Sequence, residues 1–172
     1  IRMSTDEPEE IPRYLDLIRQ SAENAAGIVS DILDFTRNTD IEKQWVLVEQ
    51  LISRVVTDAE RQDSEGRVEV ETEPAGDLEA YCDFSKMQRV LSNLVRNAAE
   101  AMTKADVAEP RVRIAAERRD DGVHVLVSDN GPGLPEEIRD RLFVPFVTRG
   151  KNAGTGLGLA IVKRFVDAHG GT

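Results

Sequence analysis

The chain of 172 residues has one cysteine and no long apolar run, which excludes disulfide-rich proteins and argues against a membrane-spanning segment. Cys82 is its only cysteine, so no disulfide can form within the chain, and this usage fits a reducing compartment. No apolar run reaches the roughly 18 residues needed to span a bilayer, and no signal peptide is recognisable. We therefore expect a cytoplasmic location, either for a whole protein or for the cytoplasmic part of a larger membrane protein.

Aromatic residues and positive charge are also scarce. Aromatics make up 5% of the chain, so the core must consist mostly of Val, Leu, Ile and Ala. The net charge of −10 argues against broad electrostatic binding to nucleic acid or to an anionic membrane. An anionic ligand such as a nucleoside triphosphate would need local dipoles, a metal ion and a few basic residues to overcome this charge. The length fits one domain with an appended element.

The first segment predicts one long helix from about Pro12 to Arg37. Proline suits the first turn of a helix, where its missing N–H costs little. The narrow, heptad-spaced apolar stripe predicts partner helices in a coiled coil. The alternative, a helix packed on its own domain, stays open. The apolar positions are Ile11, Ile18, Ala25 and Ile32 at every seventh residue, with Tyr14, Leu15, Ala22, Ile28, Val29 and Phe35 between them.

The remainder predicts an α/β sandwich in which helices cover one face of a mixed sheet. Alternating residues indicate strands, and apolar faces with a 3.6-residue period indicate helices. The expected elements, in chain order, are a linker at 38–40, a short edge strand or extended segment at 45–48, a helix at 50–62, a strand at 68–72, a turn at 74–77, a helix capped by Asp83, a hairpin with strands at 112–116 and 123–127, a short helix at 135–142, and a last helix at 156–168 that ends at His169, Gly170 and Gly171.

Two asparagines stand out on the helix that Asp83 opens. Asn93 and Asn97 are four residues apart, so they share one face, which we expect to be exposed. The oxygen of a side-chain amide can ligate Mg²⁺, which also keeps waters and takes phosphate oxygens. Taken alone, such a pair is more often two solvated or capping asparagines.

The strand at 123–127 leads into Asp129, Asn130, Gly131, Pro132 and Gly133. A carboxylate can accept a hydrogen bond from an exocyclic amine such as that of adenine. The two glycines allow the backbone to turn sharply and to approach a ring closely. Because Asp-Asn-Gly is also a common turn sequence, a plain turn after the strand is the alternative.

A second glycine cluster, Gly154, Gly156 and Gly158, directly precedes the last apolar helix. Backbone N–H groups at a helix N-terminus form a site for anions. The cluster is no Rossmann fingerprint, because no strand comes directly before it, and no Walker A loop, because no Gly-Lys-Ser/Thr follows. Between the two clusters lies the apolar run 142–146, followed by Arg149 and Lys151.

In this order, the motifs resemble the N, G1, F and G2 boxes of the histidine kinase ATP-binding domain, within the wider gyrase, Hsp90, histidine kinase and MutL superfamily. The resemblance covers about 45–171. The helix at 12–37 resembles the second helix of the kinase dimerisation hairpin. We therefore expect residues 1–38 to be part of that hairpin and residues 39–172 to be the ATP-binding catalytic domain.

The resemblance implies ATP and Mg²⁺ as cofactors and assigns roles to residues. Asp129 would hold the adenine amine, and Gly131 and Gly133 would admit the purine. Asn97 would ligate Mg²⁺, with Asn93 beside it. Arg149 or Lys151 would neutralise phosphate charge, and Phe143 and Phe146 would anchor the base of a lid. The implied contacts in and after the lid are Thr148, Arg149, Lys151, Gly154, Thr155, Gly156, Leu157 and Gly158.

The implied reaction is transfer of the ATP γ-phosphoryl group to a histidine, for relay to a response regulator aspartate. The hydrolytic relatives carry a glutamate where this chain has Asn93, and an amide cannot take a proton from water, so slow ATP hydrolysis is expected. The implied partners are a response regulator receiver domain, the protein's own phosphoacceptor helix, and a second copy joined through the N-terminal helix in a homodimer. Neither nucleic acid nor a membrane is expected to contact this chain. An anti-sigma-factor-type protein serine kinase and a non-catalytic scaffold of the same fold stay open as alternatives.

Three departures from the family pattern matter. His124 and His169 lie outside any phosphoacceptor box, so we expect structural roles for both and an acceptor helix before residue 1. The chain alone should then not autophosphorylate. The family normally continues with at least one more strand after the position of Thr172, so part of the sheet is expected to be missing. Glu100 stands where many relatives have a lysine near the phosphates, which would leave that role to the lid cations.

Overall fold

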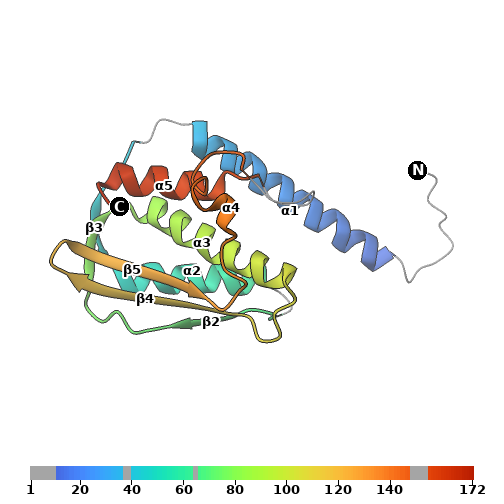
Figure 1. The fold of residues 1–172 in the computed structure, drawn as a ribbon, viewed down its shortest axis with the longest axis horizontal. Helices are drawn as coiled ribbons and strands as arrows, with labels where there is room; N and C mark the ends of the chain where they lie inside the picture. Colours follow the sequence, from blue (N-terminus) through green and yellow to red (C-terminus); the bar gives the residue numbers. More distant parts are fainter. Residues whose placement is uncertain (1–10, 37–39, 64–65, 148–154) are drawn as a thin grey trace. The chain divides into compact units, whose positions relative to one another are not determined.

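A computed structural model describes residues 11–36, 40–63, 66–147 and 155–172 (Figure 1). Its contacts divide the chain into two units, Ile1–Arg37 and Asn38–Thr172. Within the described ranges, no helix combines the length and the apolar character that crossing a membrane requires.

The first unit contains the helix α1 (Ile11–Thr36), whose 26 residues extend about 40 Å at 1.5 Å per residue. The predicted helix is therefore confirmed, with ends that differ by one residue. Several residues of its heptad stripe are more than half exposed, including Ile11, Leu15, Ile18 and Val29. An apolar stripe of this kind is what a partner helix would cover, and the coiled coil itself stays a prediction.

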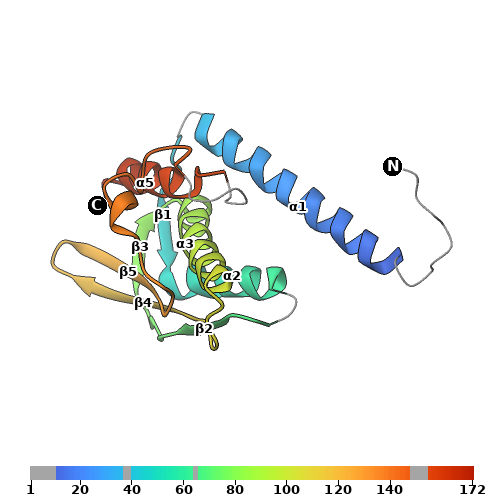
Figure 2. The ribbon, with the colours of Figure 1, turned by 45° about the vertical axis from the view of Figure 1, so that its right-hand side comes forward.

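The second unit contains two sheets and the remaining helices. In Figures 1 and 2, α2 and α3 lie along one face of the larger sheet, and α5 lies beside α3. The small sheet consists of the antiparallel strands β1 (Gln44–Leu47) and β3 (Glu79–Cys82). The larger sheet has the strand order β2 (Glu69–Thr72), β4 (Arg111–Arg119), β5 (Gly122–Asp129). In it, β2 runs parallel and β5 antiparallel to β4. The helices are α2 (Val48–Gln62), α3 (Phe84–Lys104), α4 (Glu136–Arg139) and α5 (Gly158–His169).

The observed elements match the predicted ones in type and order, apart from shifts of one to three residues at the strand ends and the following differences. Strand β3 was not predicted. Helix α2 begins two residues before the expected start. The short helix α4 ends at Arg139 and not at residue 142. Beyond it, backbone hydrogen bonds between residues three apart form successive turns as far as Val147. The last helix begins at Gly158 and not at Gly156, because Gly156 has a φ of 69°, which no α-helix accommodates.

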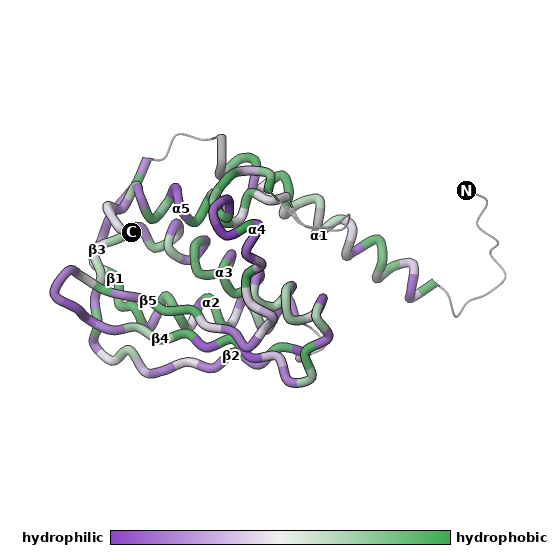
Figure 3. Tube along the Cα trace, viewed as in Figure 1, coloured by the Kyte–Doolittle hydropathy of each residue, from purple (hydrophilic) through white to green (hydrophobic). Residues whose placement is uncertain are grey.

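The core lies between the larger sheet and the helices, and it is almost entirely aliphatic, as the low aromatic content predicts. Side chains alternate along β4, so that Val112 and Ile114 face the helices with no exposed area. Met102 of α3 is equally buried, and Phe165 of α5 is 2% exposed. Figure 3 shows apolar positions along the helices, whereas the tip of the β4–β5 hairpin is hydrophilic.

The start of α3 and the end of α5 are joined by hydrogen bonds. The predicted cap, Asp83, is confirmed, since its carboxylate accepts from Lys86 N at 3.1 Å. Asp83 N donates to Nε2 of His169 at 2.9 Å, so Nδ1 carries the proton and donates to Phe165 O at 2.7 Å. Burial alone would raise the pKa of Asp83, but hydrogen bonds from Ser85, Lys86 and Glu42 outweigh it and hold that pKa below its ordinary value.

Candidate functional site

Helix α3 brings the three predicted motifs together. A Cβ added to Gly158 would lie 3.7 Å from Oδ1 of Asn93, so the start of α5 contacts the middle of α3. A Cβ added to Gly131 would lie 3.0 Å from Cγ of Met102, so the turn after β5 contacts the same helix nearer its end. Asn93 and Met102 are separated by about 14 Å of helix at 1.5 Å per residue. The motifs therefore form an extended site along α3, with Asn97 between its two ends.

Asp129 is the last residue of β5 and is exposed. Its Oδ1 accepts a hydrogen bond from Gly131 N at 2.8 Å, which closes a tight turn. A Cβ on Gly131 would come within 2.7 Å of this oxygen, so only glycine fits without moving the carboxylate. Within the described ranges, Oδ2 of Asp129 accepts no hydrogen bond from the protein. The turn thus presents one carboxylate oxygen to a ligand.

Two further residues shape this turn. Gly133 has a φ of 75°, a left-handed conformation that glycine adopts without strain. Asn130, by contrast, hydrogen-bonds to the adjacent segment before β4. Its Nδ2 donates to Glu109 O and its Oδ1 accepts from Arg111 N, both at 2.8 Å. Asn130 therefore holds the turn against the start of β4 and fixes the position of Asp129.

The two asparagines of α3 differ in their surroundings. We expected both on an exposed face, and this is wrong for Asn93, which is 1% exposed because α5 covers it. Nδ2 of Asn93 faces Gly158 O at 3.5 Å, and its Oδ1 accepts from Nη2 of Arg96 at 2.8 Å. Asn97 is half-buried one turn later, and no other described residue hydrogen-bonds to its amide. Asn97 is therefore the asparagine with a carbonyl oxygen available for a metal ion.

The start of α5 forms the opposite end of the site. Thr155 accepts a hydrogen bond from Leu157 N at 3.2 Å, and Leu157 is 1% exposed. Phe146 N donates to Gly156 O at 3.0 Å, which joins the chain on the two sides of residues 148–154. Phe143 and Phe146 are 50% and 68% exposed, and their role as the anchor of a lid stays a prediction.

Four predicted site residues lie outside the described residues. They are Thr148, Arg149, Lys151 and Gly154. The structure instead draws attention to Arg96, which the motif analysis did not select. Its spacing of three from Asn93 places both on one helical face, and this spacing is the feature by which it could have been found. Glu100 lies 3.9 Å from Lys104, an exposed ion pair on the same helix.

Both histidines hydrogen-bond within the fold, in agreement with the structural roles expected of them. Nε2 of His124 lies 2.8 Å from a carboxylate oxygen of Asp121 beside the hairpin turn. His169 connects α5 to α3 as described above.

The arrangement suits a ligand with a polar ring at one end and an anionic group at the other. The Asp129 turn can accept from a ring amine, and the free N–H groups that begin α5 favour negative charge. The described residues contain no group of three or more His, Cys, Asp or Glu that could hold a metal ion. A cation at Asn97 would thus need oxygens from the ligand and from water, which is how Mg²⁺ commonly binds with phosphates.

Comparison with known proteins agrees with this geometry. Residues 82–172 match the family described as "Histidine kinase-, DNA gyrase B-, and HSP90-like ATPase". The C4-dicarboxylate transport sensor protein DctB of Rhizobium meliloti (strain 1021) is 39% identical over 99 residues, which cover 58% of this chain and 16% of that protein.

Two solved structures extend the similarity over almost the whole chain. Full-length ShkA in complex with AMPPNP has a TM-score of 0.73 and 26% identity, covering 99% of this chain and 35% of that one. The histidine kinase ThkA in complex with the response regulator protein TrrA has a TM-score of 0.72 and 27% identity, covering 96% of this chain and 47% of that one. The predicted α/β fold class is confirmed. The chain spans less than half the length of each of these three proteins.

Proposed function

The chain belongs to the family of histidine kinase-, DNA gyrase B- and HSP90-like ATPases, and from this premise we propose that it is the ATP-binding catalytic domain of a two-component sensor histidine kinase. Residues 39–172 bind ATP, and residues 1–38 are the second helix of the dimerisation hairpin. The γ-phosphoryl group goes to a histidine on a helix outside this sequence. We also propose that this domain lies in the cytoplasm.

The observation that carries the proposal is the convergence of three motifs on α3. The Asp129 turn takes the adenine amine, with Gly131 and Gly133 against the purine. The N–H groups of α5 that follow Gly158 face the phosphates. Asn97 ligates the Mg²⁺ that bridges the phosphates. The remaining nucleotide contacts that we propose are Asn93, Thr148, Arg149, Lys151, Gly154, Thr155, Gly156 and Leu157.

The environment of Asn93 supports phosphoryl transfer rather than hydrolysis. Its amide is buried and both of its polar ends face protein groups, so it has neither the chemistry nor the freedom of a base. Water is then poorly activated, and the phosphoryl group is kept for a protein acceptor.

The proposed partners follow from the first unit and from the comparisons. The open apolar stripe of α1 supports pairing with helices of a second copy and with the phosphoacceptor helix. ThkA, which this chain resembles, forms a complex with a response regulator, and we propose a receiver domain as the partner here. The serine kinase alternative is less favoured, because kinases of that type lack an attached dimerisation helix.

Calorimetric titration with a non-hydrolysable ATP analogue, with and without Mg²⁺, tests this function. We expect binding that Mg²⁺ strengthens, a strong loss of affinity in Asp129→Asn, and a loss of the Mg²⁺ dependence in Asn97→Ala. Unchanged affinity in Asp129→Asn would refute the adenine contact. Absence of binding in the wild-type chain would favour a non-catalytic scaffold.

A further inference from the structure

The small sheet carries a pair of aromatic residues on its outer face. Trp45 of β1 and Tyr81 of β3 lie directly opposite each other in the register, and their ring centroids are 5.4 Å apart. They are 68% and 57% exposed. Because side chains alternate along a strand, the neighbours Val46 and Cys82 point the other way, and both are buried in the core. The register therefore holds both rings in water.

This use of aromatic residues is unusual for the chain. Aromatics make up 5% of the sequence, and Trp45 is its only tryptophan. A single exposed apolar residue needs no explanation, but here two large rings lie side by side on a paired strand. Trp and Tyr are enriched at protein–protein interfaces and among the residues that contribute most to binding. They also offer a large contact area with few rotatable bonds, so little entropy is lost when a partner covers them.

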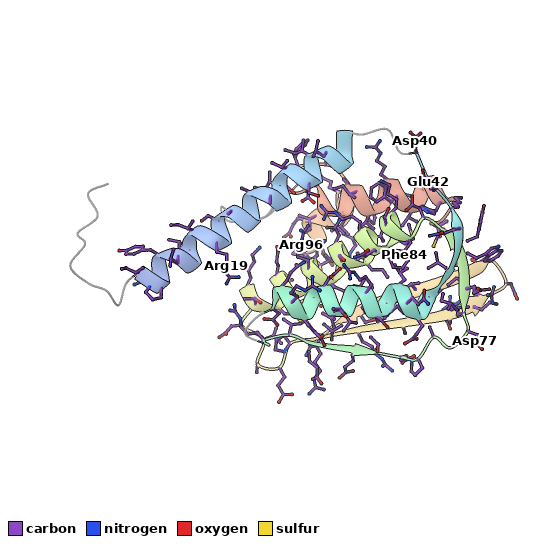
Figure 4. The ribbon with its side chains drawn as sticks, turned by 180° about the vertical axis from the view of Figure 1, so that it is seen from behind. Arg19, Asp40, Glu42, Asp77, Phe84 and Arg96 are labelled. Atoms are coloured by element: carbon purple, nitrogen blue, oxygen red, sulfur yellow. The ribbon has the colours of Figure 1, made fainter. Side chains whose placement is uncertain are left out.

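Acidic side chains flank the aromatic pair along the sheet. Figure 4 shows Asp40 and Glu42 at the end of the small sheet where β1 begins, and Asp77 at the end where β3 begins. Glu79 lies two residues from Tyr81 and therefore shares the outer face with it. All four acidic residues are exposed, and none of their carboxylates forms a hydrogen bond or ion pair with another residue that the structure describes.

Two basic residues reach the small sheet, and both bond to backbone carbonyl groups. Lys43 Nζ donates to His169 O at 3.0 Å, and Arg118 Nη2 donates to Glu79 O at 3.2 Å. The larger sheet differs, because its exposed glutamates pair with arginines. These pairs are Glu69 with Arg111, Glu73 with Arg113, and Glu117 with Arg119. The small sheet thus presents carboxylates without a counter-ion beside rings whose faces carry partial negative charge.

We propose that the outer face of β1 and β3 is a docking surface for an arginine-bearing segment of a partner protein. A cation above an aromatic ring is attracted by the negative face of the ring. A guanidinium also stacks flat on a ring while its N–H groups reach carboxylates at the side. Trp45 and Tyr81 receive the guanidinium plane, and Glu79 and Asp77 bind its N–H groups. The net charge of −10 attracts such a segment and disfavours an anionic membrane or nucleic acid.

This inference goes beyond the proposed function and does not depend on it, because none of these residues belongs to the nucleotide site. Since Trp45 is the only tryptophan, its fluorescence reports binding at this face directly. The test titrates the chain with a short amidated peptide of alternating arginine and glycine, and with the same peptide carrying glutamine in place of arginine. We expect a saturable change of emission with the arginine peptide only. The dissociation constant should be on the order of 1 mM, because exposed cation–π contacts and ion pairs each contribute little.

Variants separate the rings from the charges. Tyr81→Leu keeps an apolar side chain without the ring and should weaken binding about 2- to 5-fold, whereas Tyr81→Phe should bind as the wild type does. Glu79→Gln should weaken binding about 2-fold, and it carries the test if Tyr81→Leu does not fold. Glu60→Gln is the matched control with the same change of charge. Glu60 is exposed near the end of α2, about 18 Å along that helix from Val48, and its variant should keep the wild-type affinity.

Several outcomes would overturn the proposal. Equal weakening in Glu79→Gln and Glu60→Gln would mean that the peptide follows the net charge of the chain and not this face. Unchanged binding in Tyr81→Leu would remove the aromatic contact, and an absent response to the arginine peptide would remove the surface. A blue shift of Trp45 emission with phosphatidylcholine vesicles, without a response to the peptide, would assign the face to a lipid surface instead. Each of these outcomes leaves the nucleotide titration, and with it the proposed function, untouched.

Discussion

Replacing Gly131 by alanine should separate the geometry of the adenine turn from the stability of the fold. Gly131 has no positive φ, so the backbone accepts alanine without conformational strain. The new methyl group would instead lie 2.7 Å from Oδ1 of Asp129 and 3.0 Å from Cγ of Met102. The carboxylate is exposed and Met102 is fully buried, so the carboxylate is the group that moves.

The size of the effect follows from what the carboxylate loses. Its displacement breaks the 2.8 Å bond from Gly131 N, which holds Asp129 in position. If Asp129 binds the adenine amine, a hydrogen bond to a charged group is lost, about 1.5–3 kcal/mol or roughly a 10- to 100-fold fall in affinity. The free energy of unfolding should change by about 1 kcal/mol or less, because the contact with Met102 can relax along a flexible side chain.

Calorimetric titration with the ATP analogue and urea unfolding of the same variant measure the two quantities. Gly76→Ala is the control, since Gly76 has a φ of 57° and nothing within 4 Å of an added Cβ. That variant should lose about 1–2 kcal/mol of stability through backbone strain and keep its nucleotide affinity. Wild-type affinity in Gly131→Ala would show that the position of the Asp129 carboxylate does not decide binding. Equal affinity losses in both variants would mean that the titration reports stability alone.

Three further substitutions test the framework around the site. Because the folded-state pKa of Asp83 lies below the unfolded value of 3.8, its carboxylate stabilises the fold above that pH and loses this effect as the pH falls through the folded pKa. The stability advantage of the wild type over Asp83→Asn, measured in urea at pH 6 and pH 3, should therefore shrink at the lower pH, and a constant advantage would contradict this. His169→Ala removes the acceptor for Asp83 N and should lower the unfolding free energy by about 1–3 kcal/mol, with unchanged nucleotide affinity. Phe165→Ala should cost about 3–5 kcal/mol in the same assay, and a cost below about 1 kcal/mol would show that α5 is not part of the core.

The features predictable from the sequence are those that depend on neighbouring residues. The heptad stripe identified α1, because its spacing is repeated within one segment. The cap at Asp83 and the hairpin of β4 and β5 follow from residue types at short range. The order of the glycine and asparagine motifs likewise indicated an ATP-binding domain, since each motif is contiguous. Strand β3 escaped prediction because its pairing with β1 joins residues more than 30 positions apart.

The arrangement at the phosphate end could not be predicted in this way. Periodicity places Asn93 on one face of α3 but does not state which element covers that face. The covering element is α5, whose Gly158 lies 65 residues further along the chain. Burial of an amide without partners would cost about 1–3 kcal/mol, and the protein avoids this cost by aligning Asn93 with Gly158 O and Arg96.

This alignment has a consequence for binding. The start of α5 lies against both groups, because a Cβ on Gly158 would be at van der Waals distance, 3.7 Å, from Oδ1 of Asn93 and from Nη2 of Arg96. The same contacts that satisfy the buried amide therefore fix the start of α5 and the guanidinium in one place. A ligand that arrives finds the start of α5 already oriented, so little conformational entropy is lost on binding. Asn93, besides its proposed place among the nucleotide contacts, therefore holds the start of α5 and the side chain of Arg96 in position.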